Sequence, residues 1–478
     1  MEDSIRQLMG ELKEAHDWEG PIFRWACGVA RALTERLLGE LDAALAEERE
    51  AGWVIEGMRT HTIATRFGEL RVKRRLYRDE QGQYRYLLDE AMGVSSGPAM
   101  SQQVGEIGLL LATCLPYAQA SAVVETVLPE GHVSKMRIWR QVQALGHAER
   151  EGEEAAVQAV YGEGRPVPTG ERQVARLFVE ADGVNVPLQR EEGRRTEIKV
   201  GVAHEGWEAV GADRYRLVEK TVYASVVDGD AFWERFSLKL GQRYDVAGIE
   251  QTVVGGDGAR WVREGAGLLD GHFQLDRYHL HRALRTAYGG DEVGAHAVYR
   301  ACVAGQVDEA VQRLREREGR VNGKAAERIR HVRRYITENA EGLRDYRERL
   351  GAETTGLRGL GAIESNVDKL VAHRMKHRGM SWRVRGADSM ARLIVLREEG
   401  RLEGALGREG TTGQALRAAT LNERIKERTQ RGLGEWLQAT LPALHGPHAD
   451  RPWVRALATI ARQPLVCSRL DAHLPTEP

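Results

Sequence analysis

Two stretches decide the fold: VARLFVEADG at residues 174–183 and EQTVVGGDG at residues 250–258. Each is an apolar, strand-like run that ends in an aspartate beside glycine, and these aspartates are Asp182 and Asp257. We expect a carboxylate at the C-terminal end of a strand to be fixed by the sheet yet exposed at its edge. The flanking glycines leave room for a metal or a phosphate to approach the backbone. Asp-Gly is also a common turn dipeptide, so one such site alone carries little weight.

Two carboxylates on neighbouring strands would repel each other unless a cation lay between them. Mg²⁺ prefers carboxylate oxygen together with water and substrate phosphate, and two metals about 3.5–4 Å apart can clamp a phosphodiester. Such a site needs a third acid. Our choice is Glu364, which opens the helical segment GAIESNVDKLVAHRMKHR at 361–378. Residue spacing alone does not single it out among the 70 acids of the chain.

The elements around the two aspartates follow a definite order. We predict strands at 174–180, 196–203 and 217–225, a helix at 230–239, a strand at 250–255, a short helix, and a strand at 272–275. This order suits an α/β ribonuclease-H-like sheet.

The N-terminal third has a different pattern. Residues 1–50 predict helices, and residues 59–90 predict short strands with turns at Gly68 and Gly82. Helices at 119–128 and 134–145 flank a turn at Gly131, with Ser134 as N-cap. This is the size of a DNA-binding helix-turn-helix, although two short helices joined by such a turn are more often plain packing.

We expect seven segments. They are a helical region (1–55), a hairpin and helix-turn-helix DNA-binding region (56–150), a linker (151–172), the first part of the core (173–284), a helical insertion (285–355), the second part of the core with the Glu364 helix (356–395), and a C-terminal helical region with a tail (396–478).

Composition sets the class of protein. The 478 residues are 42% hydrophobic and 29% charged, which is ordinary for a globular protein of two to four domains. The longest apolar stretch, 107–115, is too short to span a bilayer, and four widely spaced cysteines form no CxxC pair. We therefore predict a cytoplasmic protein without a membrane partner. Signatures of P-loop nucleotide-binding proteins, zinc proteases, serine hydrolases and protein kinases are missing.

The net charge is −1, but 59 of the 69 basic residues are arginine, which forms bidentate pairs with phosphate. GC-rich codons would explain this excess equally well, and much of the arginine between 313 and 349 alternates with glutamate, as on a solvated helix. The candidate DNA contacts lie in four clusters: Arg71, Lys73, Arg74 and Arg75; Lys135, Arg137 and Arg140; Lys324, Arg328 and Arg330; Arg374 and Lys376.

Five segments together resemble the DDE transposases of the ISLre-type bacterial insertion sequences, which are distantly similar to the Mutator-like superfamily. They are FVEADGVNVPLQ (178–189), EIKVGVAHEGWE (197–208), VVGGDGARWV (253–262), LDRYHLHRAL (275–284) and GAIESNVDKLVAHRMKHRGMSW (361–382). The resemblance covers most of residues 55–395, and the motifs are specific as a set.

The resemblance implies a ribonuclease-H-like core whose catalytic and metal-binding triad is Asp182, Asp257 and Glu364. The 107 residues between the last two would then include the all-helical insertion of such transposases. Asp276 and His279 resemble the C/D-x-x-H motif of related enzymes and would support the site. An equally good reading is that His279 only forms a hydrogen bond with Asp276 and so fixes the position of the strand. Implied cofactors are two Mg²⁺ ions, which Mn²⁺ can replace.

Implied partners are DNA, as terminal repeats and target, and at least one further copy of the chain. Two alternatives remain open: a metal-dependent structure-specific nuclease or resolvase on the same fold, and a catalytically silent DNA-binding protein derived from a transposase. A two-carboxylate glycosidase is more distant, since it needs neither a third acid nor arginine-rich helices.

Overall fold

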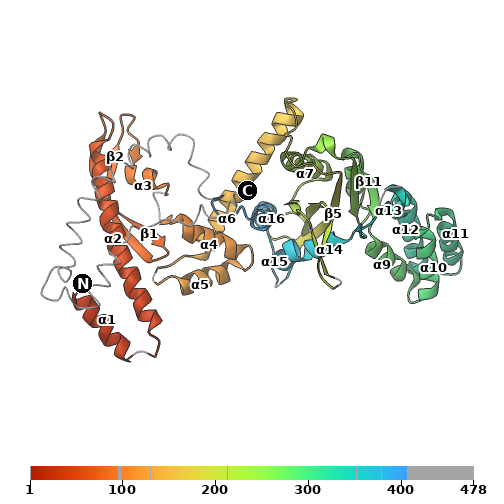
Figure 1. The fold of residues 1–478 in the computed structure, drawn as a ribbon, viewed down its shortest axis with the longest axis horizontal. Helices are drawn as coiled ribbons and strands as arrows, with labels where there is room; N and C mark the ends of the chain where they lie inside the picture. The colour runs from red at the N-terminus through yellow and green to blue at the C-terminus, as the bar shows by residue number, and fades with distance from the viewer. Residues whose placement is uncertain are drawn as a thin grey trace, which may run out of the picture. The chain divides into compact units, whose positions relative to one another are not determined.

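A computed structural model describes residues 2–14, 16–94, 99–129, 131–212, 214–350, 354–377 and 379–405 (Figure 1). The chain divides into two compact units. The first contains the described parts of Met1–Gly105 and Ala122–Val133, and the second contains Glu106–Ser121 and the described part of Ser134–Leu406. Of the expected C-terminal region, residues 406–478 lie outside the described residues.

The first unit pairs long helices with a small sheet. Its elements are α1 (Glu2–Glu14), α2 (Glu19–Glu47), β1 (Val54–Thr65), β2 (Gly68–Arg78), β3 (Tyr84–Arg85), α3 (Leu87–Met92) and β4 (Ala99–Met100). The strand order is β3-β2-β1-β4, and α2 lies along β2, as Figure 1 shows. The predicted turns are confirmed, because Gly68 and Gly82 have φ angles of 110° and 78°, which favour glycine.

Three helices follow the small sheet in the chain and precede the larger one: α4 (Gln102–Ala112), α5 (Tyr117–Val127) and α6 (Lys135–Val157). The predicted N-cap is confirmed, because the Ser134 hydroxyl accepts a hydrogen bond from the Arg137 amide at 3.3 Å. The predicted linker is wrong in its first half. Helix α6 runs to Val157 and continues as a π-helical turn, Gln158–Gly162, so residues 163–175 join it to the next strand, which begins at Arg176.

The second unit is built on a five-stranded sheet of order β11-β10-β5-β6-β9. The strands are β5 (Arg176–Pro187), β6 (Arg195–His204), β9 (Thr221–Ser225), β10 (Gln251–Gly256) and β11 (His272–Leu275). β6 is antiparallel to both β5 and β9, whereas β10 is parallel to β5 and β11. The predicted strand at 217–225 is confirmed over Thr221–Ser225 as β9, but its start is wrong, because Leu217 ends a separate hairpin of β7 (Trp207–Gly211) and β8 (Arg214–Leu217).

Alternation along β5 separates the two faces of this sheet. Leu177, Val179 and Ala181 belong to the core formed with α7 (Gly229–Arg243) and α8 (Arg260–Leu268). Glu180 faces the other way, where it accepts hydrogen bonds from the backbone of residues 361 and 363 at the start of α14 (Ala362–Val367). Asp182 has the same parity as Glu180, so it points to the α14 face.

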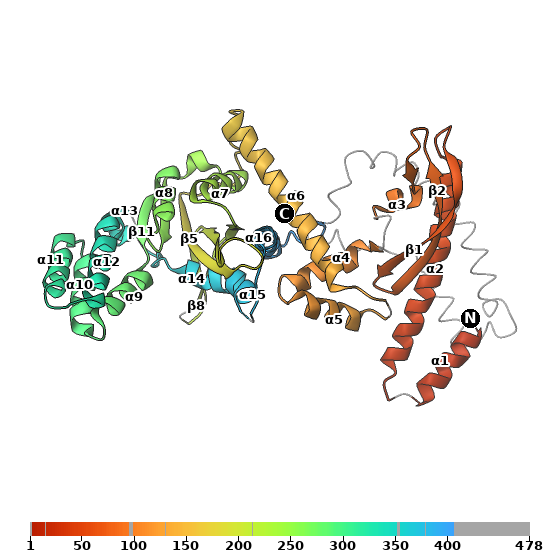
Figure 2. The same cartoon turned by 180° about the vertical axis from the view of Figure 1, so that it is seen from behind.

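The expected helical insertion is present. It comprises α9 (Arg277–Tyr288), α10 (Glu292–Val303), α11 (Val307–Glu318), α12 (Lys324–Glu338) and α13 (Tyr346–Leu350), grouped together in Figure 2. After α14 the chain forms a π-helical turn (Asp368–Ala372), α15 (His373–Met375) and α16 (Val384–Glu398). Among the described residues, no helix combines the length and the apolar character that crossing a bilayer requires.

Candidate metal centre

Asp182 lies inside β5, so the predicted strand end is placed too early. Pairing with β10 stops at Ala181 and Gly256, while pairing with β6 continues to Pro187. Asp182 is therefore held in a continuous strand, at the point where its other neighbour leaves the sheet. Asp257 follows Gly256 and so comes next to Asp182 in the parallel register. The sheet itself brings the two predicted aspartates together.

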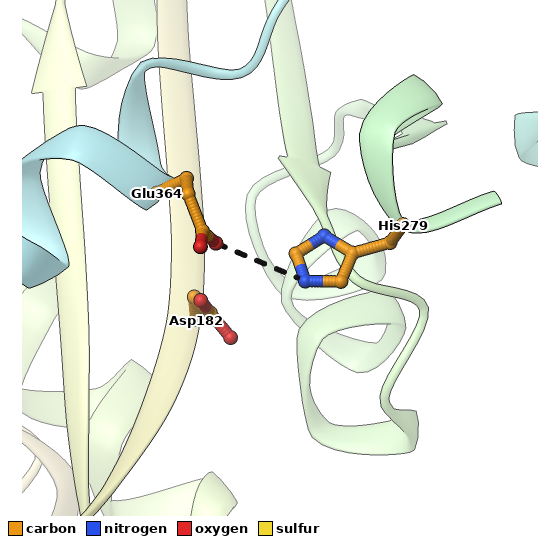
Figure 3. Close-up of side chains that lie close together, drawn as sticks. All are labelled: Asp182, His279 and Glu364. Atoms are coloured by element: carbon orange, nitrogen blue, oxygen red, sulfur yellow. Dashed lines mark ion pairs between the residues drawn. The ribbon is translucent and has the colours of Figure 1, made fainter. Parts of the chain in front are cut away.

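Three ligand atoms converge at this point, as Figure 3 shows. One atom each from Asp182, His279 and Glu364 lies within 4.8 Å of the other two. The three residues come from β5, α9 and α14, which are far apart in the sequence. Asp257 is outside this tight group, but its charge acts on Asp182.

Burial and negative charge combine at Asp182, which is only 8% exposed. Burial, followed by repulsion from Asp257, raises its pKa to about 6, although the Gly183 amide donates to it at 2.7 Å. A carboxyl group whose ionised form is disfavoured in this way gains from a cation.

A carboxylate orients the histidine. Asp276 Oδ1 caps α9 by accepting the Tyr278 amide at 2.6 Å, and its Oδ2 lies 3.6 Å from His279 Nδ1. The other ring nitrogen, Nε2, is 3.9 Å from Glu364 Oε2, the contact dashed in Figure 3. The nearby Asp276 carboxylate raises the pKa of His279. His279 thus lies with Asp182 and Glu364, and Asp276 lies beside its ring.

The helical insertion contacts the loop that carries Asp257. Tyr335, on α12, donates its hydroxyl to the Asp257 carbonyl at 2.6 Å, and Asp257 Oδ1 accepts the Ala259 amide at 2.8 Å. Gly258 has a φ of 87°, and a Cβ there would meet Asn339, so this turn requires glycine. Burial, with the nearby Asp257, raises the pKa of Tyr335. No sequence signal pointed to Tyr335, which is one aromatic residue in an arginine-rich helix.

Glu180 is a second residue that the sequence reasoning missed. It is 1% exposed, and its Oε2 accepts the amides of Gly361 at 2.8 Å and Ile363 at 3.2 Å. Its Oε1 lies 3.5 Å from Nε2 of the buried His204. Glu180 thereby fixes the start of the helix that carries Glu364 to the strand that carries Asp182. A signal was present, since Glu180 is the one charged residue in the run LFVEA.

The candidate DNA contacts are not all exposed. Arg74 and Arg374 are 2% and 3% exposed, and both have structural partners. Arg374 Nε donates to the Ala112 carbonyl at 2.6 Å, and Arg75 forms an ion pair with the buried Asp42. The side chains that remain exposed are Arg71, Lys73, Lys135, Arg140, Lys324, Arg328, Arg330 and Lys376, while Arg137 is half-buried.

We expect Arg74→Ala to destabilise the protein rather than to weaken DNA binding selectively. Arg74 lies 2.6 Å from Asp89, which also contacts His61 at 3.0 Å in a buried cluster. Removing one partner of a buried pair costs about 3–5 kcal/mol. The measurement is urea unfolding of the full chain. Lys73→Ala, an exposed site on the same strand, is the control and should change stability by less than about 0.5 kcal/mol. Equal effects of the two substitutions would contradict this role.

Comparison with known proteins gives a family. The model of a family described as "Uncharacterised protein family (UPF0236)" matches residues 13–410. The chain is 26% identical to "UPF0236 protein TTE0402" of Caldanaerobacter subterraneus subsp. tengcongensis over 411 residues, which is 83% of this chain and 74% of that protein. It is also 26% identical to "UPF0236 protein in vanSb 3'region" of Streptococcus gallolyticus over 363 residues, covering 74% of this chain and 76% of the relative. Because the family model spans most of the sequence, the chain belongs to the UPF0236 family.

Proposed function

We propose that this protein is a DNA transposase of the DDE type, which cleaves the ends of an insertion sequence and joins the freed 3′-OH to target DNA. The observation that carries the proposal is the convergence of acids from three distant segments. Ligand atoms of Asp182, Glu364 and His279 lie within 4.8 Å of one another, and Asp257 lies next to Asp182 in the sheet register. The motifs that resemble ISLre-type transposases supply these same residues.

The sheet topology supports a ribonuclease-H-like core. Three antiparallel strands, β9, β6 and β5, are extended by the parallel strands β10 and β11. The sequence order of three strands, a helix, a strand, a helix and a strand is the order expected for that fold. The helical insertion then follows β11 and precedes the Glu364 helix.

The donor set fits a hard divalent cation. Carboxylate oxygens suit Mg²⁺ and Mn²⁺, and burial together with the nearby Asp257 raises the pKa of Asp182, so its ionised form would gain from a cation. We assign Asp182, Asp257 and Glu364 as the residues that would hold two such ions. When bound, the ions would neutralise charge at the phosphodiester and activate the attacking hydroxyl.

The chain's own groups have separate tasks in this proposal. His279, whose pKa is raised by Asp276, presents Nε2 to the site and would donate a hydrogen bond to a phosphate oxygen. Asp276 fixes the ring, and Tyr335 holds the Asp257 loop. Glu180 sets the position of Glu364 through the backbone of α14.

A relative's name gives independent support. One Caldanaerobacter relative, 26% identical over 408 residues, has a name that joins eleven designations, from TTE0033 to TTE2212. We infer that several genes of one genome encode that same protein. Copying of a gene within a genome is the outcome that a transposase produces.

The test is incubation of the full chain with the genomic DNA that flanks its gene and with Mg²⁺, followed by mapping of 3′ ends and joined products. We expect metal-dependent cleavage and strand transfer, neither of which occurs in EDTA. Cleavage without joining would identify a nuclease instead. No cleavage with intact DNA binding would identify a catalytically silent DNA-binding protein. Paired ends would require at least a dimer.

Metal binding should depend on pH through Asp182. Its pKa of about 6 means that a proton must leave before a metal ion binds at lower pH. We expect Mn²⁺ affinity, measured by titration calorimetry, to change little from pH 8 to 7. It should then fall toward about ten-fold per unit below pH 6. Affinity that stayed constant from pH 7 to 5 would remove Asp182 from the ligand set.

A further inference from the structure

A groove separate from the acidic site lies in the second unit. Its volume is about 860 Å³, and its walls are the first half of α6, the loop after β5 and the segment from Met380 to Gly386 that leads into α16. Every residue that lines it belongs to the second unit. We call it the Trp139 groove, after a tryptophan on α6 that is 38% exposed.

The wall of the groove is aromatic, and part of it is rigid. Trp382 donates its indole N–H to the Met375 carbonyl at 2.9 Å, and its backbone pairs with the end of β5 through Pro187 and Gln189. Across the groove, Trp139 and Met136 are 38% and 47% exposed. Large apolar side chains that line an open groove are suited to a flat, unsaturated ligand group.

The rim of the groove is positively charged. Lys135, Arg190, Arg383 and Arg385 are exposed, and none forms an ion pair with another residue that the structure describes. No Asp or Glu is among the described lining residues. Arg150, which also lines the groove, is 3.7 Å from Asp388 and so is partly neutralised. The groove therefore presents at least four uncompensated cations around an apolar wall.

We propose that the Trp139 groove binds a single-stranded segment of DNA, with an unpaired base stacked on Trp139 and phosphates on the surrounding cations. Exposed aromatic rings beside cations are how single-stranded nucleic acid is bound without sequence preference. Paired bases in a duplex keep their faces inside the stack and cannot use Trp139 in this way. An acidic peptide would use the cations and leave the aromatic wall without a partner.

The groove is in reach of the acidic site. Gln189, on its wall, follows Asp182 by seven residues, and β5 accounts for that chain as far as Pro187, so the two residues lie at most about 25 Å apart. A strand of several nucleotides would span that distance. This step rests on the proposed function: the strand in the groove would be a strand opened at the cleavage site.

The test measures binding of fluorescein-labelled oligo-dT and of a duplex of equal length to the full chain in EDTA. We expect Trp139→Ala to weaken oligo-dT binding about ten-fold or more, with little effect on the duplex, and Trp139→Phe to restore most of the loss. Trp18→Ala, which removes a 68% exposed tryptophan outside the groove, is the matched control. A thermal melt confirms that each variant folds.

The cations are tested by salt dependence. Replacing Arg383 and Arg385 by Ala should reduce the slope of log affinity against log salt by about 1.4 for oligo-dT, whereas Arg300→Ala on α10 should leave it unchanged. Unchanged oligo-dT affinity in folded Trp139→Ala would overturn the proposal, as would an equal loss with Trp18→Ala. Since the assay contains no metal, it does not depend on cleavage. If the protein failed to catalyse strand transfer while these variants bound oligo-dT as expected, the proposed function would be rejected and the binding role of the Trp139 groove would stand.

Discussion

Asp182→Asn is expected to abolish DNA cleavage and yet to raise the melting temperature of the metal-free protein. Asparagine keeps the shape of the side chain and can still accept the Gly183 amide, but it removes the charge that holds the metal. Loss of several kcal/mol of transition-state stabilisation lowers the rate about 10³-fold or more. Binding of end DNA should remain intact. Asp257→Asn and Glu364→Gln should lose cleavage in the same way.

The stability effect has a definite sign. The pKa of Asp182 is raised to about 6 from 3.8, so its favourable contribution is fully present only below pH 3.8 and is lost progressively as pH rises from there to about 6. At pH 8 the ionised carboxylate destabilises the metal-free protein, by at most about 3 kcal/mol. The asparagine side chain of the variant does not ionise, so the variant should melt higher at pH 8 and come close to the wild type only below about pH 4, where Asp182 is protonated in both the folded and the unfolded chain. Mg²⁺ should raise the melting temperature of the wild type only.

Two outcomes would contradict this account. Cleavage near the wild-type rate in any of the three variants would remove that residue from the triad. A melting temperature at pH 8 that falls in Asp182→Asn would show that the carboxylate has a stabilising partner, and the site would not need a cation.

The sheet and its two aspartates could be predicted because each signal is local. A short apolar run before Asp-Gly identifies both strands, and their parallel pairing then fixes the proximity of Asp182 and Asp257. The extension of β5 beyond Asp182 also had a signal, since Val184 and Val186 alternate with smaller or polar residues and are buried. This signal conflicts with the Asp-Gly pair, which by itself predicts that the strand ends at Asp182.

Other features depend on contacts that no local pattern reveals. The break between β8 and β9 occurs at Glu219, whose φ of 52° is a left-handed conformation that its residue type does not indicate. Arg74 is buried because Asp89 lies opposite it, and Arg374 because the Ala112 carbonyl accepts from it. Glu364 could be chosen only through the family resemblance, since its position comes from packing of α14 on β5.

Glu180→Ala is expected to lower cleavage about 10²-fold or more, although Glu180 touches neither a metal ligand nor DNA. The substitution leaves the amides of Gly361 and Ile363 without their acceptor at the start of α14. Gly361 has a φ of 140°, so the chain enters α14 through a turn that few other residues adopt. Without the carboxylate, α14 is free to shift, and a displacement of about 1 Å at Glu364 is enough for such a loss.

Glu180→Gln is the conservative counterpart and should retain most activity. Its amide oxygen can accept both backbone N–H groups, and its NH₂ can donate to His204 Nε2. His204 Nδ1 lies 3.1 Å from the Gly206 carbonyl, which can only accept, so the tautomer with its proton on Nδ1 leaves Nε2 able to accept this bond. The pair of variants therefore separates the hydrogen bonds of Glu180 from its charge.

A control must distinguish a general loss of stability in Glu180→Ala from a displacement of Glu364. Val254→Ala truncates a fully buried side chain on the α7 face of the neighbouring strand, and it should cost about 1–3 kcal/mol of stability without moving α14. We expect Mn²⁺ affinity to fall in Glu180→Ala but not in Val254→Ala at a temperature where both are folded. If both variants lost metal affinity equally, or if Glu180→Gln were as inactive as Glu180→Ala, Glu180 would not act by positioning Glu364. Strand β5 would then contribute to the site through Asp182 alone.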